Sequence, residues 1–189
     1  MIKQTFLKSR IFWLSFPSVL ALLCLAAMFY LNHEPPPFNT IASATLRAQE
    51  QHQKVVTGYA TTATLIETVN VMLHKRGGYM SNDVLPPWIF LDNVPNWEFG
   101  VLTQVRDLAR ILRNDFSRSQ SQSTEDPMLA EADPLFHYDS DRWIPPDTEG
   151  RYRNGVDLLE GFLSKTSFYI PRLKARMRQE AYNNIFLSL

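Results

Sequence analysis

The chain has 189 residues, with 19 basic and 19 acidic side chains, one cysteine and 45% hydrophobic residues. This balanced charge argues against a nucleic-acid partner, which requires a basic surface for its phosphates. A single cysteine cannot form an intramolecular disulfide, so the fold has to be held together by packing.

The first predicted element is a membrane-spanning helix over Ile11–Leu31, a run without any charged side chain. At about 1.5 Å per residue, such a helix matches the roughly 30 Å hydrocarbon core of a bilayer. The run is longer than the apolar core of a signal peptide, and no small-residue cleavage motif follows it. Cys24 lies in the middle of the run, with Leu23 where a lipoprotein site needs a small residue. We therefore expect a permanent anchor in contact with membrane lipid.

The charges that flank this run predict its orientation. Lys3, Lys8 and Arg10 precede it, and the next Lys or Arg is Arg47. By the positive-inside bias, residues 1–10 stay in the cytoplasm and the rest of the chain is exported. The exported part carries sixteen basic against nineteen acidic residues and is therefore mildly acidic.

Residues 32–57 are expected to form a proline spacer and a stalk. Pro35, Pro36 and Pro37 make a short, stiff segment. From Asn39 to Lys54 the sequence is polar on nearly every helical face, which is typical of a helix that is solvated or covered by a partner.

The exported domain, residues 58–189, is predicted to be mainly α because apolar residues recur at helical spacing and alternating strand patterns are absent. The helices are expected over about 62–76, 97–116, 125–132, 148–163 and 170–189. Gly77 and Gly78 are predicted to end the first of them, and Asn96 is placed to cap the second. Two of the intervening loops, 79–97 and 135–147, are rich in aromatic residues and proline.

One loop carries a weak metal-ligand pattern. His137, Asp139 and Asp141 alternate along the chain and could grip a divalent cation in a turn. Because a fourth ligand is missing, an acidic turn that binds its own backbone N–H groups is the more ordinary interpretation. The sequence predicts no cofactor.

A second loop places carboxylates beside tryptophans. Asp92 and Glu98 lie near Trp88 and Trp97, and such pairs are typical of glycan-acting or glycan-binding sites. The alternative is structural, with Glu98 facing the positive end of its helix dipole and both tryptophans in the core. Nothing in the exported part indicates a nucleophilic catalytic set.

Arginines line one face of the second predicted core helix. Arg106, Arg110 and Arg113, with Arg118 beyond them, could bind a phosphate or a lipid head group. A solvated face, or pairing with acidic residues of neighbouring helices, is the more ordinary interpretation.

Long, specific stretches of the chain resemble a family of uncharacterised gammaproteobacterial inner-membrane proteins, the domain of unknown function 2333. The stretches that carry the resemblance are GGYMSNDVLPP, LDNVPNWEFGVL and DFSRSQSQSTEDP. The resemblance implies a Gram-negative source, one membrane pass and a helical periplasmic domain, but it assigns no catalytic residues. Members of the family continue with further long helices, whereas this sequence ends at Leu189, so we expect a shortened C-terminus.

We therefore expect a non-enzymatic protein that is anchored in the bacterial inner membrane and serves as a subunit or scaffold of an envelope complex. The expected contact surface consists of the loops 79–97, 117–126 and 135–147, because a loop of definite sequence is more often a contact surface than a tether. Its expected contact residues are Trp88, Phe90, Trp97, Arg118 and Trp143. A peptidoglycan-binding or glycan-acting protein that uses Asp92 and Glu98 is the alternative.

Overall fold

The computed structural model describes the backbone of residues 2–56, 58–116, 125–142 and 147–186. Side chains are described in these ranges except in 2–14, 115–116 and 168–186. All regular structure in this part of the chain is helical, which confirms the mainly α prediction.

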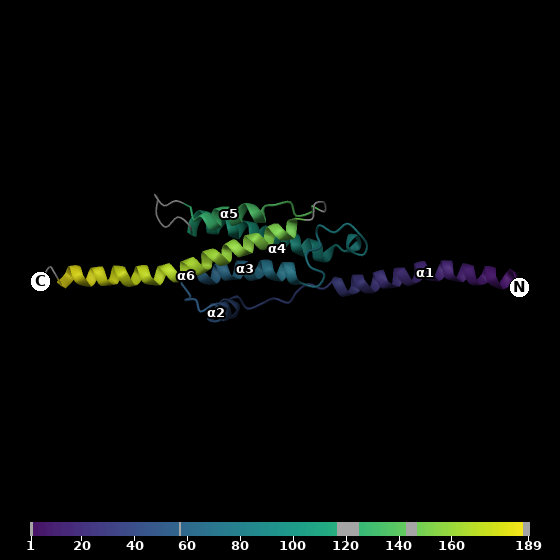
Figure 1. Cartoon of the computed structure of the whole chain (residues 1–189), viewed down its shortest axis with the longest axis horizontal. Helices are drawn as coiled ribbons and strands as arrows, with labels where there is room; N and C mark the ends of the chain where they lie inside the picture. The colour runs from purple at the N-terminus through teal and green to yellow at the C-terminus, as the bar shows by residue number, and fades with distance from the viewer. Residues whose placement is uncertain (1, 57, 117–124, 143–146, 187–189) are drawn as a thin grey trace.

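The described residues form six α-helices, which are α1 (Ile2–Leu31), α2 (Thr40–Glu50), α3 (Tyr59–His74), α4 (Asn93–Ile111), α5 (Pro127–Phe136) and α6 (Thr148–Phe186). A 3-10 turn, η1 (Trp88–Phe90), precedes α4, and a π-helical turn, η2 (Leu112–Phe116), extends it. In Figure 1, α2 to α5 and the first part of α6 gather in the middle of the molecule. The helix α1 and the end of α6 project from this bundle in opposite directions.

The main core is built around α3, which packs against α2, α4 and α6. The apolar residues that recur at helical spacing along α3 are all buried: Leu65, Ile66, Val69, Met72 and Leu73. Tyr152 of α6 lies between Tyr79, whose ring it meets edge-on at 5.6 Å, and Phe136, whose ring stacks at 6.4 Å. Burial of these large side chains supplies stability that no disulfide can contribute here.

The helix α2 lies on the bundle instead of standing free. Its N-terminus is capped by Asn39, whose side chain accepts hydrogen bonds from two backbone N–H groups. Ala44 and Ala48, one turn apart, are buried in the main core against α3. Arg47 pairs with Glu160 of α6 at 2.8 Å. The helix expected to be solvated or covered by a partner is therefore covered by the rest of the same chain.

Two helices start earlier than predicted. The helix α3 starts at Tyr59, after Gly58 in the left-handed conformation. The helix α4 starts at Asn93 and not at Trp97, because Pro95 is tolerated in a first helical turn, where its missing N–H has no partner to lose. Asn96 therefore lies inside α4 and does not cap it, and the prediction of a cap at this residue is wrong.

Two helices also continue further than predicted. The helix α5 passes Pro134 to Phe136, which is completely buried, whereas the sequence predicted an end near Ala132. The helix α6 is continuous across the gap expected between residues 163 and 170. Ser167 of this stretch exchanges two hydrogen bonds with the backbone of Lys54, which ties it to the bundle. The stretch 164–170 contains neither glycine nor proline, and the backbone of α6 continues as a helix through Pro171.

No helix in the part of the chain that the structure describes is both long and apolar enough to qualify as a membrane span. The predicted span Ile11–Leu31 begins within residues 2–14, whose side chains lie outside the described part. The backbone of α1 is helical from Ile2 to Leu31, through Pro17. Its large apolar side chains between Phe16 and Tyr30 include eight that are 53–82% exposed.

We predict that Gly155→Ala destabilises the domain, whereas Gly100→Ala does not. A Cβ at Gly155 of α6 would lie 2.7 Å from Cζ of the buried Phe136 ring, and overpacking of this kind costs about 1–3 kcal/mol. Gly100 of α4 has open space around it, so alanine should add about 0.5–1 kcal/mol of helix propensity. Urea unfolding of both variants measures the difference. Equal shifts in the same direction would contradict the packing argument.

Candidate functional site

The segment between α3 and α4 is fixed by a buried ion pair. The Glu98 carboxylate contacts the Lys75 ammonium, and the two side chains are 0% and 2% exposed. Glu98 also accepts hydrogen bonds from the backbone N–H groups of Met80, at 2.9 Å, and Ser81, at 2.8 Å, and from the Ser81 hydroxyl. Lys75 donates to the carbonyl of Gly78. The pair therefore binds the chain after the Gly77-Gly78 turn to both flanking helices.

Burial raises the pKa values of two groups near this ion pair, Asp83 and Tyr79. The pKa of Asp83 is raised, first by desolvation and then by the negative charge of Glu98, while Lys75 opposes the shift. Burial also raises the pKa of the Tyr79 phenol, which donates a hydrogen bond to the carbonyl of Ser140 at 2.8 Å. The phenol is therefore neutral at physiological pH and ties this segment to the loop after α5.

The same segment holds the end of α1 in a second, smaller core. We call it the junction cluster, and it comprises Leu31, Met80, Leu91 and Val94, with Met28 and Trp88 packed against it. Gly77 allows the close approach, since a Cβ there would lie 2.7 Å from Cδ2 of Leu31. One turn of α1 thus contacts the domain directly, and the proline spacer is not its only link.

The aromatic residues predicted to be contacts fall in different environments. Trp88 is half-buried in the junction cluster, and within the described residues its indole Nε1 has no hydrogen-bond partner. Trp97 packs against the main core. Phe90 is 63% exposed and lies beside α1. Arg118 and Trp143 lie outside the described residues.

Of the three predicted metal residues, His137 is engaged in other side-chain contacts. The Nδ1 atom of His137 lies 2.9 Å from the carbonyl of Asp133, and its Nε2 atom lies 2.7 Å from the Arg110 guanidinium. Asp139 accepts a hydrogen bond from Thr148 through its backbone carbonyl, and Asp141 is exposed. Within the described ranges, no three potential ligands gather as a metal site. His137 therefore serves the contact between α4 and α5.

The predicted arginine face serves the same contact. Arg106 donates to the carbonyls of Phe136 and Tyr138, at 2.8 and 2.9 Å. Arg113 pairs with Glu125 and Asp133, at 3.1 and 3.0 Å. Arg106 and Arg113 therefore bind neighbouring parts of the same chain, as in the more ordinary interpretation of this face, and their described contacts are not with a phosphate or lipid head group.

The carboxylates of the glycan alternative do not form a site together. Asp92 is exposed and precedes α4, whereas Glu98 faces inward and is completely buried. Every described partner of the Glu98 carboxylate belongs to the ion pair or to the chain around Met80. In this geometry the Glu98 carboxylate cannot reach a ligand on the surface.

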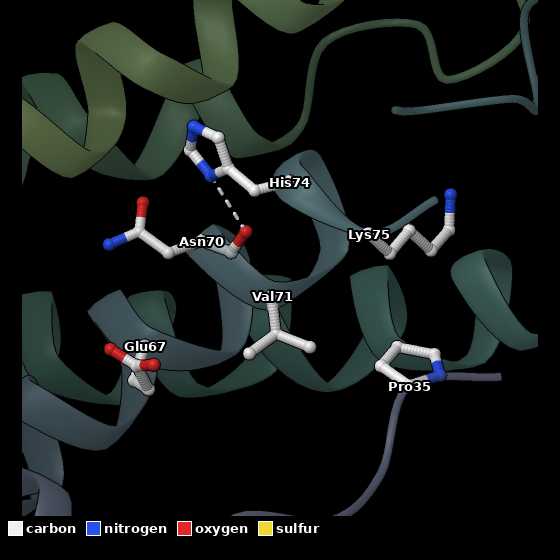
Figure 2. Close-up of a pocket in the computed structure, with 6 residues that line it drawn as sticks. All are labelled: Pro35, Glu67, Asn70, Val71, His74 and Lys75. Carbon is white, nitrogen blue, oxygen red and sulfur yellow. Dashed lines mark hydrogen bonds between the residues drawn. The ribbon is translucent and has the colours of Figure 1, made fainter. Parts of the chain in front are cut away.

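An open groove along α3 is the surface that the sequence did not indicate. Figure 2 shows its first pocket, about 330 Å³, where Glu67, Asn70 and His74 follow one face of α3 and Pro35 closes one side. A second pocket of about 500 Å³ shares Glu67 and continues along α2 past Leu46. The spacing of Glu67, Asn70 and His74 indicates one polar face of α3, but the sequence alone does not show that Pro35 and α2 flank this face and make it a groove.

Comparison with known proteins identifies one family. Residues 6–179 match the model of a family described as uncharacterized protein conserved in bacteria (DUF2333). No curated protein and no solved structure matches the chain.

Proposed function

The chain belongs to the DUF2333 family, and we propose that it is a single-pass protein of the bacterial inner membrane with its helical domain in the periplasm. The observation that carries this proposal is the exposure of large apolar side chains along the second half of α1, from Phe16 to Tyr30. Monomeric soluble proteins rarely expose an apolar surface of this extent, whereas lipid covers it in a spanning helix. The basic residues Lys3, Lys8 and Arg10 support the orientation.

For a periplasmic domain that is anchored in this way, the role that fits best is that of a non-enzymatic subunit or scaffold of an envelope complex. The carboxylate at the centre of the site, Glu98, is sealed in an ion pair and holds the fold together. The groove along α2 and α3 is open, and it combines apolar Leu46 with acidic Glu50 and Glu67, while Glu160 of its lining is paired with Arg47. A groove of this composition suits a helix or an extended segment of a partner protein with basic side chains.

Membrane attachment and orientation are tested by fractionation of intact cells. We expect the full chain to stay in the membrane pellet after alkaline extraction. We also expect protease to cleave the domain only when the outer membrane has been opened. Release into the soluble fraction, or protection of the domain in spheroplasts, would overturn the proposal.

The scaffold role is tested by photo-crosslinking in intact cells. A photoreactive residue at Leu46, in the groove, should give a discrete adduct that mass spectrometry identifies as the same protein in repeated experiments. Ile41, which is more exposed but does not line the groove, is the matched control on the same helix. Failure to form an adduct at Leu46, together with purification of the protein alone in mild detergent, would refute a scaffold role at this groove.

A further inference from the structure

The segment before α4 presents an uninterrupted apolar surface. Residues 84–91, VLPPWIFL, contain no charged side chain, have the Trp88 indole N–H as their one polar side-chain group, and lie between Asp83 and Asp92. Val84, Leu85, Ile89 and Phe90 are each 43–63% exposed, although the segment also contributes Leu91 to the junction cluster. Four exposed apolar side chains in seven residues require an apolar neighbour.

The position of this segment indicates what that neighbour is. Figure 1 shows that the chain between α3 and α4 lies at the end of the bundle from which α1 projects. Phe90 faces an open apolar hollow of about 600 Å³ whose other lining residues all belong to α1, between Pro17 and Met28. At about 1.5 Å per residue, Leu20 and Leu25 of this lining lie roughly 9–16 Å along the helix from Leu31. This is the depth of one bilayer leaflet, about 15 Å of hydrocarbon.

Polar residues mark the membrane surface at the level of Leu31. The Arg76 guanidinium lies over the Tyr30 ring, 5.2 Å from its centroid. Tyrosine and arginine are typical of the boundary between hydrocarbon and water. His33 and Glu34 follow on one side of this level, and the apolar face of α1 continues on the other. Phe90 lies on the apolar side.

We propose that residues 84–90 enter the periplasmic leaflet of the same bilayer beside α1, so that lipid covers their exposed side chains. This inference rests on the membrane attachment proposed above. The exposed surface of the segment is continuous with that of α1, and its only flanking charges, Asp83 and Asp92, lie at its two ends. With two elements in the bilayer, the ion pair of Lys75 and Glu98 fixes the tilt of the domain on the membrane surface.

Depth-dependent fluorescence quenching tests this inference in the full chain. In a Cys24→Ser background, single cysteines at positions 22, 90 and 111 are labelled with an environment-sensitive fluorophore. Each protein is reconstituted into phosphatidylethanolamine–phosphatidylglycerol vesicles that contain lipid with a nitroxide at mid-chain. Leu22 reports on α1, and Ile111 is the matched control, because it is an exposed apolar residue at the other end of α4, about 27 Å from Asn93. A label at position 89 repeats the test should position 90 alter the fold.

The outcomes separate the inference from the proposed function. We expect blue-shifted emission and comparable quenching at positions 22 and 90, with neither effect at 111. Quenching at 22 without quenching at 90 and 89 would overturn the inference and leave the anchor intact, and shielding at 90 from aqueous quenchers would then indicate contact with a second copy of this chain, the only protein in the vesicles. Absence of quenching at 22 would refute the membrane attachment itself.

Discussion

Replacement of Glu98 by alanine is expected to destabilise the domain by about 3–5 kcal/mol, the typical effect of breaking a buried ion pair by removing one partner. The Lys75 ammonium would remain buried without a counter-charge. The N–H groups of Met80 and Ser81 would also lose their acceptor. An unpaired buried donor carries its full desolvation penalty, so the two losses act in the same direction.

Further variants separate the charge from the hydrogen bonds. Glu98→Gln keeps an oxygen for the backbone donors but leaves Lys75 uncompensated, so we expect an intermediate loss. The double variant Lys75→Met/Glu98→Gln removes both charges and should recover part of that loss. Glu149→Ala is the control, because Glu149 pairs with Arg153 on the surface of α6, and exposed pairs contribute about 0–1 kcal/mol. If urea unfolding gave Glu98→Ala the stability of Glu149→Ala, the ion pair would not hold the segment.

The helical class and the core of α3 could be predicted because both depend on local periodicity. The stripe from Leu65 to Leu73 repeats at helical spacing, and any helix with that stripe has to bury it. The helix stop at Gly77-Gly78 is equally local, since both residues adopt positive φ angles that glycine accepts without strain.

The role of Glu98 could not be predicted in the same way. Its partners are Lys75 and the backbone near Met80, and both belong to the chain between α3 and α4. They meet Glu98 only after this chain has folded back onto α4. From sequence, Glu98 near two tryptophans fitted a glycan site as well as a structural position. Its position four residues before Leu102 places Glu98 on the buried stripe of α4, but the sequence does not show which cation or backbone donors lie opposite it.

The helix α2 shows a signal that was present but overlooked. Its polar sequence suggested a solvated or partner-covered stalk, yet Ala44 and Ala48 are separated by one helical turn. Two small residues at that spacing let one helix lie close to another without any large apolar side chain. In this chain they place α2 against α3, and the groove lies along this contact, lined by α2 together with Glu67 of α3 and Glu160 of α6.

Replacement of Gly77 by alanine is expected to loosen the junction between α1 and the domain. Gly77 has φ of +84°, a conformation that costs a residue with a Cβ about 1–3 kcal/mol. The new Cβ would also lie 2.7 Å from Cδ2 of Leu31, which would have to shift, and 3.1 Å from Sδ of Met80, which would have to give by a few tenths of an ångström, so the packing of the junction cluster would be disturbed. With about 1–3 kcal/mol for the overpacking, the sum is a loss of about 2–6 kcal/mol in unfolding free energy.

Gly78→Ala is the matched control for this prediction. Gly78 also has a positive φ, of +71°, but a Cβ there would meet no atom closer than 3.9 Å. Alanine at position 78 therefore causes similar backbone strain without disturbing α1. Both variants should unfold at lower urea concentration, whereas only Gly77→Ala should speed amide hydrogen exchange at residues 28–32. Equal exchange in both variants would show that Leu31 does not hold α1 to the domain. If the exchange rates do differ, Gly77→Ala should also reduce lipid quenching at position 90, because Phe90 keeps its depth beside α1 only while the junction cluster is intact.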